Sequence, residues 1–155
     1  MQSAEKIDGV KIIGLESHVD ERGYFMEVYR KSLLKNVPVR QVSVSLTNPG
    51  IIKAFHWHRR QFDVWHIVSG KALVVLHDMR ENSPTAGCTQ SFVADDLNPI
   101  LVVIPKMVAH GYKVLGDKPL LMLYLMDKEY DRKNPDEGRI EFDDKSIGFD
   151  WHSEG

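Results

Sequence analysis

The sequence predicts an all-β protein, a closed barrel or sandwich of about ten short strands with one or two short helices. Apolar or alternating runs recur along the whole of its 155 residues. These runs are rich in Val, Ile, Phe and Tyr, which strands favour. Gly, Pro, Asn and Asp separate the runs at short intervals, as is typical of closed sheets.

Four strands are expected in the first part of the chain. The run Gln41-Val42-Ser43-Val44-Ser45-Leu46 alternates strictly, which indicates a strand with one face in water. The turn residues Asn48-Pro49-Gly50 separate this strand from the next. Residues 30–36, around two consecutive leucines, form the one segment that looks helical. The expected strands cover residues 10–15, 24–29, 41–46 and 51–58.

Six more strands are expected further along the chain. Turn-forming residues such as Ser69-Gly70, Asn98-Pro99 and Leu115-Gly116-Asp117 separate them. The polar stretch 128–137 is expected to be a surface loop near the end. The six strands cover residues 62–68, 72–77, 89–93, 101–104, 112–115 and 120–126.

Composition narrows the class of protein. Apolar residues make up 43% and charged residues 27%, which suits one soluble domain over residues 1–155. A net charge of −2 gives no sign of a nucleic-acid or membrane-surface partner. Cys88 is the only cysteine, so no intrachain disulfide can form. The sequence lacks a signal-peptide pattern and a spanning apolar run, so we expect a cytoplasmic protein.

Histidines cluster in one pattern. Gly50, five residues, His56-Trp57-His58, four residues, Asp63, six residues and Gly70 follow one another, and His110 comes later after a proline. His56 and His58 share a strand face because they are two residues apart. The pattern resembles the two motifs of the cupin superfamily, which implies a cupin double-stranded β-helix, a jelly-roll barrel.

The cupin motifs suggest a metal site, although other roles are open. In metal-binding cupins these motifs supply His, His, an acid and a further His. Asp63 stands where the superfamily prefers Glu, and Met107 where it prefers Gly. A histidine beside a strand is often only a packing residue, and we assign that role to His66 and His77.

A closer resemblance spans most of the chain. Five blocks, in order, are similar to the dTDP-4-dehydrorhamnose 3,5-epimerase family of the cupin superfamily. Any one block alone would be a weak signal, but five in the same order are specific. The blocks are residues 20–27, 50–56, 83–87, 104–112 and 142–151.

This resemblance implies roles for particular residues. His56 matches the catalytic base of the family, and Asp144 matches the carboxylate that orients the base. Family members are homodimers in which an N-terminal segment crosses to the partner. The residues matched to pyrophosphate, sugar or nucleotide binding are Arg22, His110, Phe25, Glu27 and Gln41.

These residue types suit the implied reaction. A ketone at C4 acidifies the protons on C3 and C5, and a neutral imidazole can remove one of them. A carboxylate on the second ring nitrogen would stabilise the imidazolium, as in the Ser-His-Asp triad. The enolate needs a cation or hydrogen-bond donor, and an acid on the other face must return the proton. The pyrophosphate needs cations such as Arg22.

Two departures from the family affect residues that take part in its reaction. Asp63 replaces an active-site lysine that can stabilise an enolate, while Lys53 replaces an arginine and keeps its charge. The acidic tyrosine of the family aligns with Leu123. Tyr124 lies one residue on, where alternation would turn it to the opposite face unless a bulge intervenes. Tyr130, from the following loop, is a further candidate.

Three hypotheses follow. The leading one is a nucleotide-sugar epimerase of deoxysugar or polysaccharide biosynthesis, acting on a dTDP-4-keto-6-deoxyhexose at C3, C5 or both without a cofactor. The second is a metal-binding cupin that uses His56, His58, Asp63 and His110. The third is a non-catalytic sugar-binding cupin. The first two conflict at His56, because one ring nitrogen cannot both bind a metal and abstract a proton.

Overall fold

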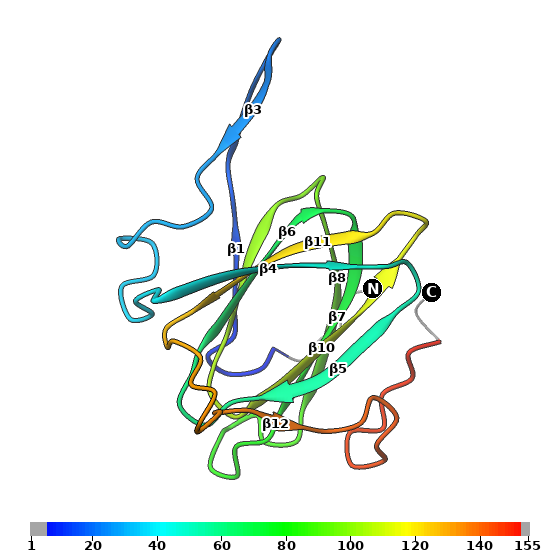
Figure 1. The fold of residues 1–155 in the computed structure, drawn as a ribbon. Helices are drawn as coiled ribbons and strands as arrows, with labels where there is room; N and C mark the ends of the chain where they lie inside the picture. Colours follow the sequence, from blue (N-terminus) through cyan, green and yellow to red (C-terminus); the bar gives the residue numbers. More distant parts are fainter. Residues whose placement is uncertain (1–5, 153–155) are drawn as a thin grey trace.

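The computed structural model describes residues 6–152 (Figure 1). Over these residues the chain forms two five-stranded antiparallel sheets and one two-stranded hairpin. Residues 1–5, where the signal-peptide pattern is lacking, and 153–155 lie outside this part. The strands are β1 (Lys11–Gly14), β2 (Ser17–Asp20), β3 (Gly23–Met26), β4 (Gln41–Thr47), β5 (Ile52–Trp57), β6 (Asp63–Ser69), β7 (Lys71–Asp78), β8 (Thr89–Asp95), β9 (Ile100–Ile104), β10 (Val108–Leu115), β11 (Leu120–Met126) and β12 (Gly138–Arg139).

The predicted all-β class is confirmed, and each of the ten expected runs overlaps a strand. The helix expected over residues 30–36 is wrong. Two successive turns occupy this segment, closed by the N–H groups of Leu33 and Val37 on the carbonyls of Arg30 and Leu34. These turns bury Leu34 and Val37 against the outside of the barrel, so packing outweighs the local helical pattern. No helix able to cross a membrane occurs among the described residues.

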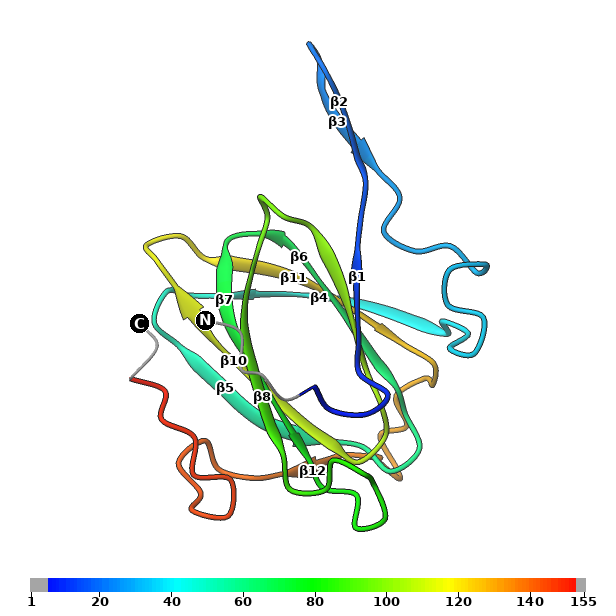
Figure 2. The ribbon, with the colours of Figure 1, turned by 180° about the vertical axis from the view of Figure 1, so that it is seen from behind.

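The two sheets interleave distant parts of the chain. One sheet has the order β1-β9-β6-β11-β4, and the other has the order β12-β5-β10-β7-β8. Figures 1 and 2 show the sheets facing each other around a common interior. Apolar side chains from both sheets form a core in this interior, among them Trp65, Val74, Phe92, Val102 and Met122. The order places β5 and β11, which both carry candidate residues, in opposite walls.

Two chain segments cover the outer faces of the sheets. The turns that bury Leu34 and Val37 pack against Val64, Leu101 and Leu125 of the first sheet. The C-terminal segment covers the second sheet through Trp151, whose indole packs near Phe55 with ring centroids 5.6 Å apart. Because both faces are covered, β6, β7 and β10 are buried along almost their whole length.

Strand β4 shows an unexpected distribution of side chains. The strict alternation predicted one face in water, and alternation is present. However, the exposed face carries Val42, Val44 and Leu46, while Gln41 and Ser43 line an internal cavity. The β2–β3 hairpin also stands away from the barrel (Figures 1 and 2). An apolar surface on an edge strand is typical of an interface.

Candidate active site

A cavity of about 650 Å³ opens between the two sheets. Its walls carry polar side chains from both sheets and from the 128–137 segment. Most of the predicted site residues meet here, although they come from distant parts of the chain. The predicted residues that line the cavity are Gln41, Lys53, His56, His58, Asp63, His110, Tyr124 and Tyr130.

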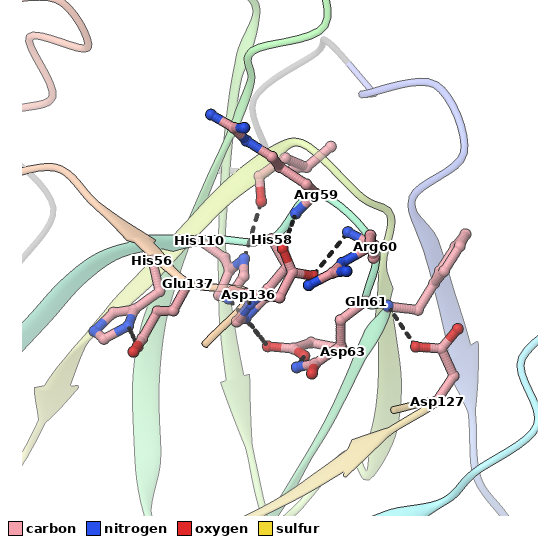
Figure 3. Close-up of polar contacts among 12 residues, drawn as sticks. His56, His58, Arg59, Arg60, Gln61, Asp63, His110, Asp127, Asp136 and Glu137 are labelled. Atoms are coloured by element: carbon pink, nitrogen blue, oxygen red, sulfur yellow. Dashed lines mark hydrogen bonds and ion pairs between the residues drawn. The ribbon is translucent and has the colours of Figure 1, made fainter. Parts of the chain in front are cut away.

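His56 is held by an acid that the sequence did not suggest. Its Nδ1 contacts a carboxylate oxygen of Glu137, as Figure 3 shows. Glu137 directly precedes β12, which pairs with β5 so that Gly138 faces Trp57 and Arg139 faces His56. A β-carbon on Gly138 would lie 2.0 Å from the Trp57 ring. Glycine at this position therefore lets β12 approach and brings Glu137 to His56.

The His56 ring is disposed to act as a base. Burial lowers the pKa of His56 below its ordinary value, and the Glu137 carboxylate opposes this only in part. The imidazole is therefore neutral near pH 7. Because Nδ1 is occupied by Glu137, Nε2 is the nitrogen left for proton transfer.

The expected pairing of Asp144 with His56 is wrong. Asp144 is exposed, and its carboxylate accepts the N–H of Ser146 at 2.8 Å. Its carbonyl accepts the N–H groups of Ile147 and Gly148. Asp144 thus forms a local turn, the structure that aspartate commonly adopts in loops. Glu137 occupies the place at His56 that the resemblance assigned to Asp144.

A second histidine group surrounds Asp63. The same carboxylate oxygen, Oδ2, lies 3.3 Å from Nε2 of His58 and 3.1 Å from Nε2 of His110. The other oxygen, Oδ1, accepts a 2.6 Å hydrogen bond from Gln61. Burial lowers the pKa of His58, but the Asp63 carboxylate outweighs it and raises that pKa to about 8. Burial raises the pKa of Asp63, yet the two histidines hold it well below its usual range.

The two cupin-like motifs therefore converge as the spacing predicted. His110 lies beside His56 in the register of β10 and β5. The histidines without motif support lie elsewhere: His66 contacts the carbonyl of Ile100, and His77 contacts the hydroxyl of Thr89. Neither of these two rings lines the cavity, which agrees with a packing role.

Tyr124 faces the cavity, and Leu123 does not. Met122, Tyr124 and Met126 point to the interior, whereas Leu123 packs in the outer cluster. Unbroken alternation along β11 therefore places the tyrosine inward, and no bulge in this strand is needed to bring it to the cavity. The Tyr124 hydroxyl lies 3.0 Å from that of Tyr112, and burial raises the pKa of Tyr124. The phenol is thus protonated at neutral pH.

The 128–137 segment forms one rim of the cavity. The backbone N–H of Tyr130 donates to Oε1 of Gln41 at 2.8 Å, which ties the loop to β4. The Asp136 carboxylate accepts the backbone N–H groups of Arg59 and Arg60. Sequence reasoning missed Asp136 and Glu137, because a polar stretch near the end of a chain resembles any solvated loop. The glycine directly after them is the one hint of close packing.

Three predicted substrate-binding residues lie outside the cavity of their own chain. Arg22 sits at the tip of the β2–β3 hairpin and pairs with Asp20. Phe25 is exposed on β3, and Glu27 pairs with Arg30 at 2.6 Å. The β2–β3 hairpin, which includes Arg22 and Phe25, stands away from the barrel, and Glu27 directly follows it (Figure 1).

Known proteins are similar to this chain over nearly its full length. The family described as dTDP-4-dehydrorhamnose 3,5-epimerase matches residues 4–155. The spore coat polysaccharide biosynthesis protein SpsL of Bacillus subtilis is 47% identical over 96% of this chain and 98% of its own length. A probable low-salt glycan biosynthesis epimerase of Haloferax volcanii is 35% identical over 96% of both chains.

Solved structures agree with these relatives. A dTDP sugar isomerase from Desulfovibrio desulfuricans superposes with a TM-score of 0.86 at 25% identity, over 94% of this chain and 92% of that one. A Legionella pneumophila epimerase in complex with dTDP-4-keto-L-rhamnose gives 0.84 at 26% identity, over 98% and 83%. The fold is therefore the cupin-like barrel that the motifs predicted. The chain belongs to the dTDP-4-dehydrorhamnose 3,5-epimerase family.

Proposed function

We propose that this protein epimerises a dTDP-linked 4-keto-6-deoxyhexose, with His56 as the base that removes the proton beside the ketone. The observation that carries this role is the His56 ring at the cavity, held through Nδ1 by Glu137, while burial lowers its pKa. The name of the Bacillus subtilis relative and the ligand of the Legionella pneumophila structure support a dTDP-sugar in polysaccharide biosynthesis.

The two walls of the cavity provide groups for the two faces of a sugar ring. His56 stands on β5 in one sheet, and Tyr124 stands on β11 in the other. Nε2 of His56 takes the proton from C3 or C5, and the imidazolium that forms is stabilised by Glu137. The Tyr124 phenol, protonated at neutral pH, returns a proton to the opposite face, which inverts the centre. Tyr130 on the rim is the second candidate for this acid.

The charges on the substrate also find partners. Lys53 lines the cavity from β5, and its ammonium group provides the positive charge that the enolate or the pyrophosphate requires. Gln41 from β4 also lines the cavity and is placed to hydrogen-bond the ligand.

We further propose a homodimer in which the β2–β3 hairpin of one protomer lies over the cavity of its partner. The exposed apolar face of β4 and the protruding hairpin support this arrangement. In this arrangement Arg22, Phe25 and Glu27 would reach a nucleotide bound in the partner's cavity, since they do not line the cavity of their own chain. Sedimentation velocity of the wild type and of Val44→Asp measures it: the wild type should sediment as a dimer and the variant as a monomer.

The test of the catalytic role is proton exchange with solvent. In D₂O, wild-type protein should incorporate deuterium at C3 or C5 of a dTDP-4-keto-6-deoxyhexose. His56→Asn should slow this exchange by about 10²- to 10⁴-fold, the usual contribution of a general base. His77→Asn is the matched control, since His77 lies outside the cavity, and it should exchange at the wild-type rate.

Two outcomes would contradict the proposal. Wild-type exchange in a folded His56→Asn protein would remove His56 from the reaction. Tight binding of several nucleotide-linked keto sugars without any exchange would instead favour a sugar-binding protein without catalytic activity.

A further inference from the structure

The hydrogen bonds around Asp63 determine which ring nitrogens carry protons. Nδ1 of His110 lies 2.9 Å from the carbonyl of Val108, and Nδ1 of His58 contacts the carbonyl of Asp136. A carbonyl oxygen can only accept a hydrogen bond, so both Nδ1 atoms must carry the hydrogen. In the neutral imidazole the other nitrogen, Nε2, then holds a lone pair.

Both Nε2 atoms point at an oxygen that is itself an acceptor. Oδ2 of Asp63 lies 3.1 Å and 3.3 Å from them, and all three residues are largely buried. Gln61 already donates to the other carboxylate oxygen, Oδ1. The lone pairs of the two Nε2 atoms and of Oδ2 therefore face one another and repel. Either a proton on each Nε2 or a metal cation between the three atoms would remove this repulsion.

The spacing of these three atoms suits a metal ion. One nitrogen from each histidine and one oxygen of Asp63 lie within 4.8 Å of one another. Ligands placed about 2.0–2.2 Å from a transition metal lie about 3.0–3.5 Å apart, which the two Asp63 distances match. Donation of the second ring N–H to a backbone carbonyl is also the usual way in which proteins orient histidine ligands.

We propose that His58, Asp63 and His110 bind one divalent transition-metal ion in the cavity. Two imidazoles and a carboxylate suit Zn²⁺, Fe²⁺, Co²⁺ or Ni²⁺, whereas Mg²⁺ and Ca²⁺ prefer oxygen ligands alone. Three protein ligands leave coordination positions open, as in catalytic rather than structural metal sites. Because all three residues line the cavity, these positions face the space where a ligand docks.

This site leaves His56 available as a base. The sequence pattern included His56 among four ligands, but in the structure its Nδ1 is paired with Glu137 instead. Metal binding and proton abstraction therefore fall on different histidines, and the conflict between the two hypotheses disappears. An ion beside His56 would polarise a substrate carbonyl and supply the positive charge that Asp63 cannot. The metal site itself does not depend on the proposed reaction.

The experiment measures metal uptake without substrate. Full-length protein, stripped with a chelator and dialysed, is titrated with Co²⁺ while its visible absorption is recorded, and Zn²⁺ is then measured by elemental analysis. The wild type should take up one ion per chain with the spectrum of nitrogen and oxygen ligands. Asp63→Asn and His58→Gln should weaken binding by more than about 100-fold, beyond the 10- to 100-fold effect of residues that only support a ligand.

Two control variants make the test specific. His56→Gln and His77→Gln keep the three proposed ligands and should bind Co²⁺ like the wild type. Loss of binding in His56→Gln would overturn the three-ligand assignment. A folded, stripped wild type that takes up no more Co²⁺ than Asp63→Asn would overturn the metal site. In that case nitrogen-15 NMR should find both rings doubly protonated. The wild-type titration decides the matter even if a variant fails to fold.

Discussion

His56 and His58 are separated by one residue, yet their surroundings differ in kind. The His56 side chain is 37% exposed and pairs with Glu137 from the rim segment. The His58 side chain is 12% exposed and pairs with Asp63, which is also bound by His110 and Gln61. Glu137 holds the single, partly exposed ring of His56, whereas Asp63 is shared by the buried rings of His58 and His110.

This difference separates two kinds of chemistry. A half-exposed imidazole with one nitrogen fixed and one free can gain and lose a proton as a reaction proceeds. Two buried imidazoles whose free nitrogens converge on one carboxylate are suited to hold a positive charge in place. The alternation of a strand and the end of β5 at Trp57 allow both arrangements within three residues.

A third acid, Asp78, provides a reference for both groups. It is buried at the end of β7, where Arg80 binds both carboxylate oxygens at 2.8 Å and the hydroxyls of Ser83 and Thr85 add two bonds. Arg80 is permanently charged, whereas an imidazole such as that of His58 can become neutral. Burial raises the pKa of Asp78, but Arg80 holds it far below its usual range.

The largest expected effect is on catalysis, in Glu137→Gln. The amide keeps the size of the side chain but cannot stabilise the imidazolium, so kcat for deuterium exchange should fall by about 10³-fold with KM little changed. Co²⁺ affinity should stay at the wild-type value, because Glu137 does not touch the Asp63 group. A wild-type kcat in this variant would contradict the role given to the His56–Glu137 pair, because His56 would then act as a base without the carboxylate.

The next effect is on stability, in Asp78→Asn. Removing this charge leaves the Arg80 guanidinium without the carboxylate that binds it at two points and should cost about 3 kcal/mol in the free energy of unfolding, measured by urea denaturation at pH 7. Asp63→Asn in metal-free protein should cost less than Asp78→Asn, because an imidazole such as that of His58 can become neutral, whereas the guanidinium of Arg80 cannot. Equal losses in the two variants would show that burial alone decides the cost.

The stability difference at Asp78 should also depend on pH. The pKa of Asp78 is lower in the folded than in the unfolded chain, so its contribution is full above the unfolded value, about 4. That contribution is lost as the pH falls through the folded pKa. The gap between wild type and Asp78→Asn should therefore shrink below about pH 4.

The smallest expected effect is in Gly138→Ala. The added β-carbon would meet the Trp57 ring, so β12 and the adjacent Glu137 must shift relative to His56. A displacement of this kind should lower kcat by about 10-fold, since proton transfer depends on short, aligned contacts. Ser83→Ala, at the Asp78 cluster, is a matched control that should lose stability without losing kcat. An unchanged kcat in Gly138→Ala would show that Glu137 tolerates movement of β12.

Much of the fold and part of the site were predictable from local patterns. Period-two alternation and turn residues located the strands, because both are properties of neighbouring residues. The spacing around His56, His58, Asp63 and Gly70 indicated a cupin-like site, and these histidines do line a cavity with His110. The failures were the helix at Leu33–Leu34 and the partner of His56.

Those failures share a physical cause. The turns that bury Leu34 are stabilised by strands from later in the chain, which no local pattern contains. Asp144 and Glu137 are both acids in the last part of the sequence, and only the pairing of β12 with β5 brings one of them to His56. The inward direction of Tyr124 likewise follows from the register of β11 in its sheet.

The sequence by itself thus determined the all-β class, the strand positions and the set of chemical groups, because backbone preference and side-chain chemistry are local. Only the tertiary structure decided which acid serves His56, and that His56 stands apart from the Asp63 group. Those choices rest on contacts between residues about 80 positions apart, such as His56 with Glu137. Such groups come within hydrogen-bond distance because the folded chain brings distant segments together, which spacing along the sequence does not determine.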